Sequence, residues 1–352
     1  MKQSKKVVAR IIILILALFT VIPGTVSQKV YAEPGGSESS QAADASKDDS
    51  NKKEEKKEED MTPEEREKKA EEDAYKMEIQ SNGWKNWPKG PGTYGEAAIV
   101  MDAGTGSILY AKNIDEHEYP ASITKVLTSL IALKYGNLSD KVTFSNDCIS
   151  FMQPGDSSVG LKEGNVISLE QALYATLLAS ANEAAYAVAE NVGKNAGHDY
   201  NWFIQQMNEE CKSLGGNNSN FVNANGLHDD NHYTTAYDLY LIFNECIKHE
   251  DFVNIIQSEA YTAYYTDVDG NSQEALFTPT NLYAQGEVDV PENVTIVGGK
   301  TGTTDEAGYC LILMEKDSSD NPYISIVMGA SEKPVLYEDM TSLIEAIPSG
   351  QQ

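Results

Sequence analysis

Apolar and polar positions alternate, from Glu96 onward, in patterns that predict strands at both ends of a domain and helices between them. Residues 96–113 contain two apolar runs around Gly104-Thr105-Gly106, which predicts a β-hairpin. Residues 293–302 and 308–331, near the other end, are apolar runs separated by polar turns, as is typical of further strands. We therefore expect an α+β fold in which one antiparallel sheet is built from both ends of the domain, with a helical region inserted.

The segment between these strands carries the spacing of buried and amphipathic helices. A helix that starts at Ile123 is apolar over most of its circumference, and Gly136 is placed to end it. Residues 168–193 begin with a capping signal at Ser168 and predict two helices with a break near residues 180–182. Further helices are predicted at about 199–214, 234–248 and 335–347.

Two segments of different character precede this domain. Residues 1–32 combine a basic start, an apolar run from Ile11 to Ile22 and small residues near Ala32, the order typical of a secretory signal peptide. The alternative is an uncleaved membrane anchor, although the apolar run is shorter than the roughly 20 residues that span a bilayer. Residues 33–80 are polar and charged, so we expect an acidic low-complexity spacer that cannot fold alone. The catalytic domain is then expected at 81–352.

The charge of the chain argues against nucleic acid as a partner. Of the formal net charge of −27, residues 1–32 carry +5 and residues 33–80 carry −8, which leaves −24 for the remaining residues. An acidic excess of this size repels a polyphosphate backbone.

Cysteines and histidines give no metal site. His228 and His232 flank two aspartates, but no further residues stand at ligand spacing, and we predict neither a metal nor a cofactor. Widely separated cysteines without a C-x-x-C pair leave disulfides and buried thiols both open. They are Cys148, Cys211, Cys246 and Cys310.

Lys125 is the unusual residue of the apolar helix, because a buried ammonium without a partner costs several kcal/mol or loses its proton. Ser122 lies one helical turn before it, so the amine can reach the hydroxyl. A serine hydroxyl needs an adjacent base to act as a nucleophile, and a lysine of lowered pKa can be that base. The structural alternative is a lysine that extends its ammonium to water. The same S-x-x-K spacing at residues 50–53 has no apolar helix around it.

Two more polar motifs follow along the chain. Ser180-Ala181-Asn182 interrupts a helical pattern, where its polar residues can also be simple helix punctuation. Lys300-Thr301-Gly302 combines a cation and a hydroxyl with glycines that allow close approach to the backbone, which suits a carboxylate ligand. Each motif alone also fits ordinary loop composition, as Ser319-Asp320-Asn321 does in the terminal hairpin turn. All three motifs in this order are strong evidence for a shared site, which no single motif provides.

In this order the motifs resemble those of low-molecular-mass penicillin-binding proteins that are serine-type D-alanyl-D-alanine carboxypeptidases. The resemblance runs from about Glu96 to Ser331 and includes ASITK at 121–125, LLASANEAA at 177–185 and FVNANGLHDDNHYTTAYDL at 221–239. It implies a penicillin-binding/β-lactamase-like fold. Together with the predicted signal peptide, it points to an exported enzyme, at the outer face of the cytoplasmic membrane or in the cell wall. Its substrate would be a peptidoglycan stem peptide and its covalent inhibitors β-lactams, with membrane contact only through an uncleaved N-terminal segment.

The resemblance also implies a role for each motif residue. Ser122 would be the acylated nucleophile, Lys125 its base and Ser180 the proton relay toward the leaving amine. Asn182 would contact the substrate amide and Lys125. The terminal carboxylate would be held by Lys300, Thr301 and Thr303, and the backbone N–H groups of Ser122 and Thr303 match the positions of an oxyanion hole.

The chain departs from the family pattern at two positions. Ala181 stands where the family commonly has glycine, and Asn225 where it often has histidine. Neither change removes a catalytic group.

Three functions are compatible with the motifs. The main hypothesis is a carboxypeptidase that trims the terminal D-alanine from stem peptides. A serine β-lactamase is the nearest alternative, but residues 212–221, KSLGGNNSNF, have no acid where class A enzymes carry a deacylating glutamate. The third is a catalytically silent module that binds the wall or acts in sporulation, which would have no reason to keep a buried lysine.

Overall fold

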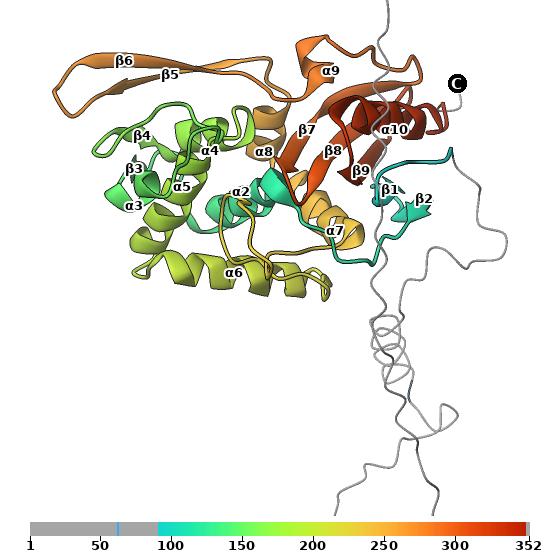
Figure 1. The fold of residues 1–352 in the computed structure, drawn as a ribbon, viewed down its shortest axis with the longest axis horizontal. Coiled ribbons are helices and arrows are strands. Elements are labelled where there is room, and N and C mark those ends of the chain that lie inside the picture. The colour runs from blue at the N-terminus through green and yellow to red at the C-terminus, as the bar shows by residue number, and fades with distance from the viewer. Residues whose placement is uncertain (1–61, 63–90, 350–352) are drawn as a thin grey trace, which may run out of the picture. The chain divides into compact units, whose positions relative to one another are not determined.

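A five-stranded antiparallel sheet, in the order β2-β1-β9-β8-β7, is the central element of the computed structural model, which describes residue 62 and residues 91–349 (Figure 1). The strands from the start of the domain are β1 (Ala97–Asp102) and β2 (Ser107–Lys112). Those from its end are β7 (Val294–Thr304), β8 (Gly308–Asp317) and β9 (Pro322–Ala330). Because β1 pairs with β9, both ends of the domain share one sheet, as predicted. The predicted signal peptide, and the spacer apart from residue 62, lie outside the described residues.

The two faces of the sheet pack into different cores, because successive side chains of a strand point to opposite sides. In β1, Ile99 and Met101 join the core shared with the helical region, while Ala98 and Val100 join a smaller core. The helix α10 (Lys333–Glu345) packs on β8 and β9 and closes that smaller core. The sheet is therefore covered on both faces, and the helical face is the one that meets Ser122.

The helix α2 (Thr124–Tyr135) is the centre of the inserted helical region and is preceded by one 3-10 turn, η2 (Ala121–Ile123). All its residues from Thr124 to Ala132 are buried. Four helices contact it, which explains why its sequence is apolar over most of its circumference. They are α4 (Leu169–Leu177), α5 (Asn182–Asn195), α6 (Tyr200–Ser213) and α7 (Ala236–Cys246).

Gly136 ends α2 for a different reason from the one that the sequence suggests. Its φ is −110°, which is not the left-handed conformation of a glycine helix stop. A Cβ at this position would lie 2.5 Å from Leu169 Cδ2 and 2.9 Å from the carbonyl oxygen of Ala132. A side chain at this position would clash with the last turn of α2 itself and with Leu169 of α4, so the predicted boundary is correct and its predicted cause is wrong.

The other predicted helices are present with boundaries shifted by a few residues at most. Residues 168–193 form α4 and α5 with the predicted break between them, and Ser168 and Gln171 form the predicted capping box. The last three predicted helices correspond to α6, α7 and α10.

A second antiparallel sheet, in the order β3-β4-β5-β6, was not predicted from the sequence. Its strands β3 (Lys141–Thr143) and β4 (Val166–Ser168) have three residues each, too few to show a period of two. Of these two, β4 pairs with β5 (Tyr261–Thr266), which comes about a hundred residues later in the chain and pairs on its other side with β6 (Ser272–Phe277). The short helices α3 (Asn146–Ser150), α8 (Glu250–Ile256) and α9 (Leu282–Gln285) were also missed.

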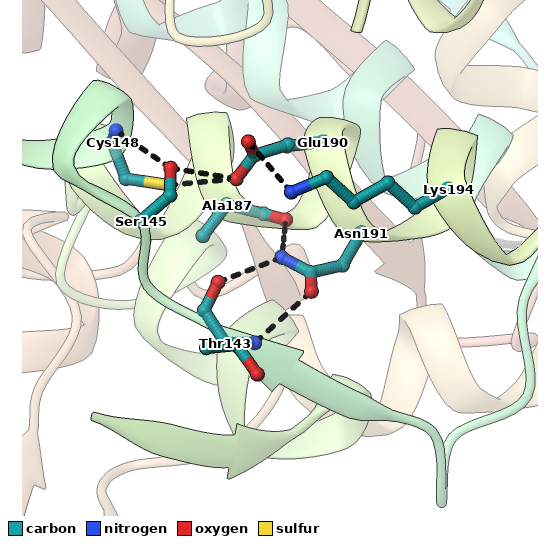
Figure 2. A network of polar contacts seen from close by, with 7 residues as sticks. All are labelled: Thr143, Ser145, Cys148, Ala187, Glu190, Asn191 and Lys194. Carbon is teal, nitrogen blue, oxygen red and sulfur yellow. Dashed lines mark hydrogen bonds and ion pairs between the residues drawn. The ribbon is translucent and has the colours of Figure 1, made fainter. Parts of the chain in front are cut away.

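Polar side chains tie α5 to β3 and α3 (Figure 2). The amide of Asn191 accepts a hydrogen bond from the backbone N–H of Thr143 at 3.1 Å and donates one to its carbonyl at 3.0 Å, as a neighbouring strand would. Glu190 accepts hydrogen bonds from Ser145 Oγ at 2.8 Å and from Cys148 Sγ at 3.3 Å. These contacts fix the second half of α5, whose first residue belongs to the candidate site.

The cysteines are buried and free, which favours the buried-thiol alternative over disulfides. Within residue 62 and residues 91–349, no helix is both long and apolar enough to cross a bilayer.

Candidate active site

The predicted contact between Lys125 and Ser122 is present. Lys125 Nζ lies 2.8 Å from Ser122 Oγ, and the lysine side chain is 0% exposed. Its other contacts are Asn182 Oδ1 at 2.8 Å and the carbonyl oxygen of Asn225 at 2.5 Å. These two oxygens can only accept hydrogen bonds, whereas a serine hydroxyl can also donate one. The set fits an ammonium that donates to all three oxygens, and it also fits a neutral amine whose two N–H bonds serve the two carbonyl-type oxygens while its lone pair accepts from the Ser122 hydroxyl.

The pKa of Lys125 is held well below its ordinary value, first by burial and then by the positive charge of Lys300. The negative charges of Glu183 and Asp156 oppose this shift without cancelling it. Burial penalises an ammonium because the low-dielectric interior cannot replace its hydration. The structural alternative, an ammonium extended to water, does not apply to this lysine.

The second motif lies at the break between α4 and α5, where Ser180 adopts a left-handed conformation with φ of +59°. The serine is buried, and its Oγ accepts a hydrogen bond from Lys300 Nζ at 2.9 Å. Asn182 begins α5, and its backbone N–H donates to the carbonyl of Ser157 at 2.9 Å. The break therefore directs two polar side chains of one motif toward the two buried lysines.

Lys300 lies on β7 with 1% of its surface exposed. Burial lowers the pKa of Lys300 to about 7. Besides Ser180, its Nζ donates to the carbonyl oxygen of Thr301 at 2.7 Å. The structure thus brings together two sets of contacts, Lys125 with Ser122 and Asn182 and Lys300 with Ser180, and the second motif contributes one residue to each.

Two glycines allow other segments to close on the turn that carries Ser122. A Cβ at Gly302 would lie 2.8 Å from the carbonyl oxygen of Pro120 and 3.1 Å from the backbone nitrogen of Ser122. At Gly226, whose φ is +82°, a Cβ would lie 1.9 Å from the carbonyl oxygen of Ala121. Neither position tolerates a side chain, because the atoms in the way belong to the backbone. The third motif reaches Ser122 for this reason.

The two threonines of the third motif are placed differently. The Thr301 hydroxyl lies 2.5 Å from Thr280 Oγ1, which belongs to the segment before α9. Thr303 is exposed, and its hydroxyl donates to the carbonyl of Gly302 at 2.8 Å. Thr301 therefore has a partner from another element, whereas the Thr303 side chain is bonded within its own strand.

A buried carboxylate next to the second motif was missed by the sequence analysis. Glu183 Oε1 accepts hydrogen bonds from Ser158 Oγ at 2.6 Å and from the backbone N–H groups of Val159 at 2.8 Å and Gly160 at 3.2 Å. Its other oxygen, Oε2, is buried without a partner. Glu183 thus ties the segment 157–160 to the start of α5. The sequence feature that could have identified Glu183 is its position directly after Asn182 of the second motif.

His232 is a packed histidine with both ring nitrogens in use. The backbone N–H of Val222 donates to Nδ1 at 3.0 Å, so Nε2 carries the hydrogen and donates to Thr124 Oγ1 at 2.7 Å. Burial lowers the pKa of His232 to about 4. No group of three or more His, Cys, Asp or Glu residues is arranged for a metal ion within the described part of the chain.

Comparisons with known proteins agree with this geometry. A family model for peptidase S11, described as D-alanyl-D-alanine carboxypeptidase, matches residues 86–332. The D-alanyl-D-alanine carboxypeptidase DacF of Bacillus subtilis (strain 168) is 30% identical over 255 residues, covering 71% of this chain and 61% of the relative. DacA of Haemophilus influenzae is 30% identical over 236 residues, covering 66% and 56%. The chain thus spans about three fifths of the length of these curated relatives.

Solved structures show the same fold. The DD-transpeptidase of Streptomyces K15 matches with a TM-score of 0.67 and 26% identity, covering 74% of this chain and 98% of that one. Penicillin binding protein 5 from Haemophilus influenzae matches with a TM-score of 0.62 and 25% identity, covering 73% of this chain and 72% of that one. The expected penicillin-binding fold is thereby confirmed.

Proposed function

Because the chain belongs to the peptidase S11 family of D-alanyl-D-alanine carboxypeptidases, we propose that it removes the last residue of peptides ending in D-Ala-D-Ala, with Ser122 as nucleophile. One observation carries the proposal: a fully buried lysine whose amine is 2.8 Å from a serine hydroxyl at the start of a helix. A lysine placed in this way has lost its hydration, and activation of the serine accounts for its burial.

Acylation begins when neutral Lys125 takes the proton of the Ser122 hydroxyl while Oγ attacks the carbonyl carbon of the penultimate D-alanine. The backbone N–H groups of Ser122 and Thr303 would stabilise the oxyanion. The C–N bond then breaks, and Lys125 passes the proton it took from Ser122 to the leaving amine through Ser180, which returns Lys125 to its neutral form. D-alanine leaves, and the rest of the peptide stays bound as an ester on Ser122. The bond from Lys300 to Ser180 supports this relay, because it holds the hydroxyl in place.

Deacylation consumes one water. The water gives a proton to the amine of Lys125 and attacks the ester carbonyl, the bond to Oγ breaks, and Ser122 regains its proton. The net reaction is hydrolysis of one peptide bond, and Lys125 returns to its neutral form.

Recognition of the substrate would rest on the third motif and on Asn182. Lys300 would supply positive charge for the terminal carboxylate, and the hydroxyls of Thr301 and Thr303 would supply hydrogen bonds. Asn182 Oδ1 already accepts from Lys125, so its amide group is free to contact the substrate backbone.

The biological substrate would be the peptidoglycan stem peptide, and β-lactams would acylate the same serine. We place the enzyme outside the cytoplasmic membrane because residues 1–32 have the sequence of a secretory signal peptide. Membrane contact would then occur only if that segment stays uncleaved.

A fluorescent penicillin separates the competing functions. Stable labelling that Ser122→Ala abolishes supports the peptidase, rapid turnover of the label supports a β-lactamase, and absence of labelling supports a silent module.

An amine acceptor added to the peptide assay tests a second reaction, because the structural neighbour from Streptomyces K15 is named a DD-transpeptidase. Formation of a new amide product would then compete with hydrolysis.

A further inference from the structure

We propose that Thr280 is a positioning residue for the substrate carboxylate and that it acts by orienting the hydroxyl of Thr301. This inference rests on the proposed function and extends its carboxylate site to a residue outside the three motifs. Thr280 lies in the segment between β6 and α9, and Thr301 lies on β7.

The contact itself directs the Thr301 hydroxyl. Thr280 Oγ1 and Thr301 Oγ1 are 2.5 Å apart, and both residues are only partly buried, so a ligand can reach them. One of the two hydroxyls must donate to the other. When Thr280 donates, Thr301 accepts on one side and turns its own hydrogen outward, where a carboxylate can accept it. A donor that is itself accepting a hydrogen bond is polarised and donates more strongly.

Thr280 is held in place by its neighbours in sequence. Gln285 Nε2 donates to the carbonyl of Pro279 at 2.7 Å, and Asn281 Oδ1 accepts from the backbone N–H of Tyr283 at 3.0 Å. The backbone N–H of Leu282 donates to the hydroxyl of a tyrosine in α10 at 2.9 Å. The segment is therefore fixed on both sides of Thr280, which limits the movement of the Thr280 backbone when a ligand binds.

The charges of the domain explain why oriented hydroxyls matter. The arginines of the chain are Arg10 and Arg66, and both lie outside the described residues. The cation of the third motif is Lys300, which is buried and already donates to Ser180 Oγ and to the carbonyl of Thr301. Lys300 can supply positive charge to a carboxylate, but two of its donors are already in use, so further hydrogen bonds must come from hydroxyl groups. Thr301 is the hydroxyl donor that a second element orients.

The test compares two substrates and three variants. The substrates are a peptide ending in D-Ala-D-Ala with a free carboxylate and the same peptide as its C-terminal amide. Thr280→Val keeps the shape and removes the hydroxyl, Thr280→Ser restores the hydroxyl, and Thr278→Val is a matched control at an exposed threonine of the same segment. We expect Thr280→Val to lower kcat/KM on the free acid about 10-fold, mainly through KM, and to change the amide less than about 2-fold. Thr280→Ser and Thr278→Val should stay within about 3-fold of the wild type on both substrates.

The preference for acid over amide decides the outcome. An unchanged preference in Thr280→Val overturns the inference, and so does an equal fall on both substrates, which would mean general damage to the fold. If the wild type releases no D-alanine from the free acid, the proposed function itself fails, and this inference fails with it. If the wild type releases D-alanine and Thr280→Val keeps the wild-type preference for acid over amide, the inference about Thr280 is wrong and the proposed function still holds.

Discussion

In the proposed mechanism the chemistry depends on Lys125, and the surroundings of this residue act on its charge in two directions. Burial and Lys300 lower its pKa, whereas the charges of Glu183 and Asp156 raise it. The neutral amine dominates because the low-dielectric surroundings penalise the ammonium more than two carboxylates favour it.

Lys125→Arg should slow acylation by penicillin by about 100-fold or more, because a guanidinium stays protonated and cannot take the serine proton. The rate of covalent labelling, followed in a stopped time course, measures this. Acylation of the arginine variant at the wild-type rate would mean that the lysine has only a structural role.

Glu183→Gln should shift the acid limb of the rate–pH profile to lower pH. The carboxylate raises the pKa of Lys125, so its removal lets the amine lose its proton at lower pH. The groups that act on this amine are Lys300 from β7, Glu183 from α5 and Asp156 from the preceding loop. Glu332→Gln, at an exposed position, is the control and should leave the limb unchanged. If the acid limb of Glu183→Gln moves to higher pH or does not move, the electrostatic role of Glu183 is contradicted.

At the scale of elements, long periodic segments were predicted well and short ones were not. The spacing of α2, α5 and α6 and the apolar runs of β1, β8 and β9 are long enough to fix their type. The two three-residue strands of the second sheet carry no period, and the pairing of β4 with β5 joins distant segments. The same limit applies to the site. Motif order predicted Ser122, Lys125 and Lys300 as candidate site residues, whereas the contact of Thr280 with Thr301 arises from packing between segments and has no local signature.

The close approach of β7 to η2 can be tested at one position. Gly302→Ala places a methyl group against the carbonyl of Pro120 and the backbone nitrogen of Ser122, so the strand or the turn must shift. We expect kcat/KM to fall by about 100-fold, as for other small displacements of a catalytic group. The control is Gly92→Ala, where a methyl group meets nothing within 4 Å. Equal activity of the two variants would show that this contact does not position the nucleophile.

At the scale of the whole domain, the central sheet separates the catalytic core from the core beneath α10. Glu315 on β8 is 0% exposed, and neither of its carboxylate oxygens has a hydrogen-bond partner. Burial raises the pKa of Glu315 to about 8, so the folded protein holds a proton that the unfolded chain releases at lower pH. The folded state therefore binds more protons between the two pKa values, and its stability falls as the pH rises through this window.

Glu315→Gln should remove this loss of stability at rising pH, because an amide does not ionise. Thermal unfolding followed by circular dichroism should show that the variant gains in Tm relative to the wild type when the pH is raised from 5 to 8. The two proteins should differ least at pH 5, where the buried acid is protonated in the folded state. A constant difference in Tm across this range would contradict the protonated state of Glu315.

Release of D-alanine is the measurement that tests the central claim most directly. Wild-type protein and Ser122→Ala are incubated with a peptide ending in D-Ala-D-Ala, and free D-alanine is measured together with the shortened peptide. We predict equal amounts of the two products from the wild type. Ser122→Ala should release at least about 1,000-fold less at an unchanged Tm, because one hydroxyl is lost and no buried apolar volume. Comparable release by Ser122→Ala, or no release by the wild type, would contradict the account.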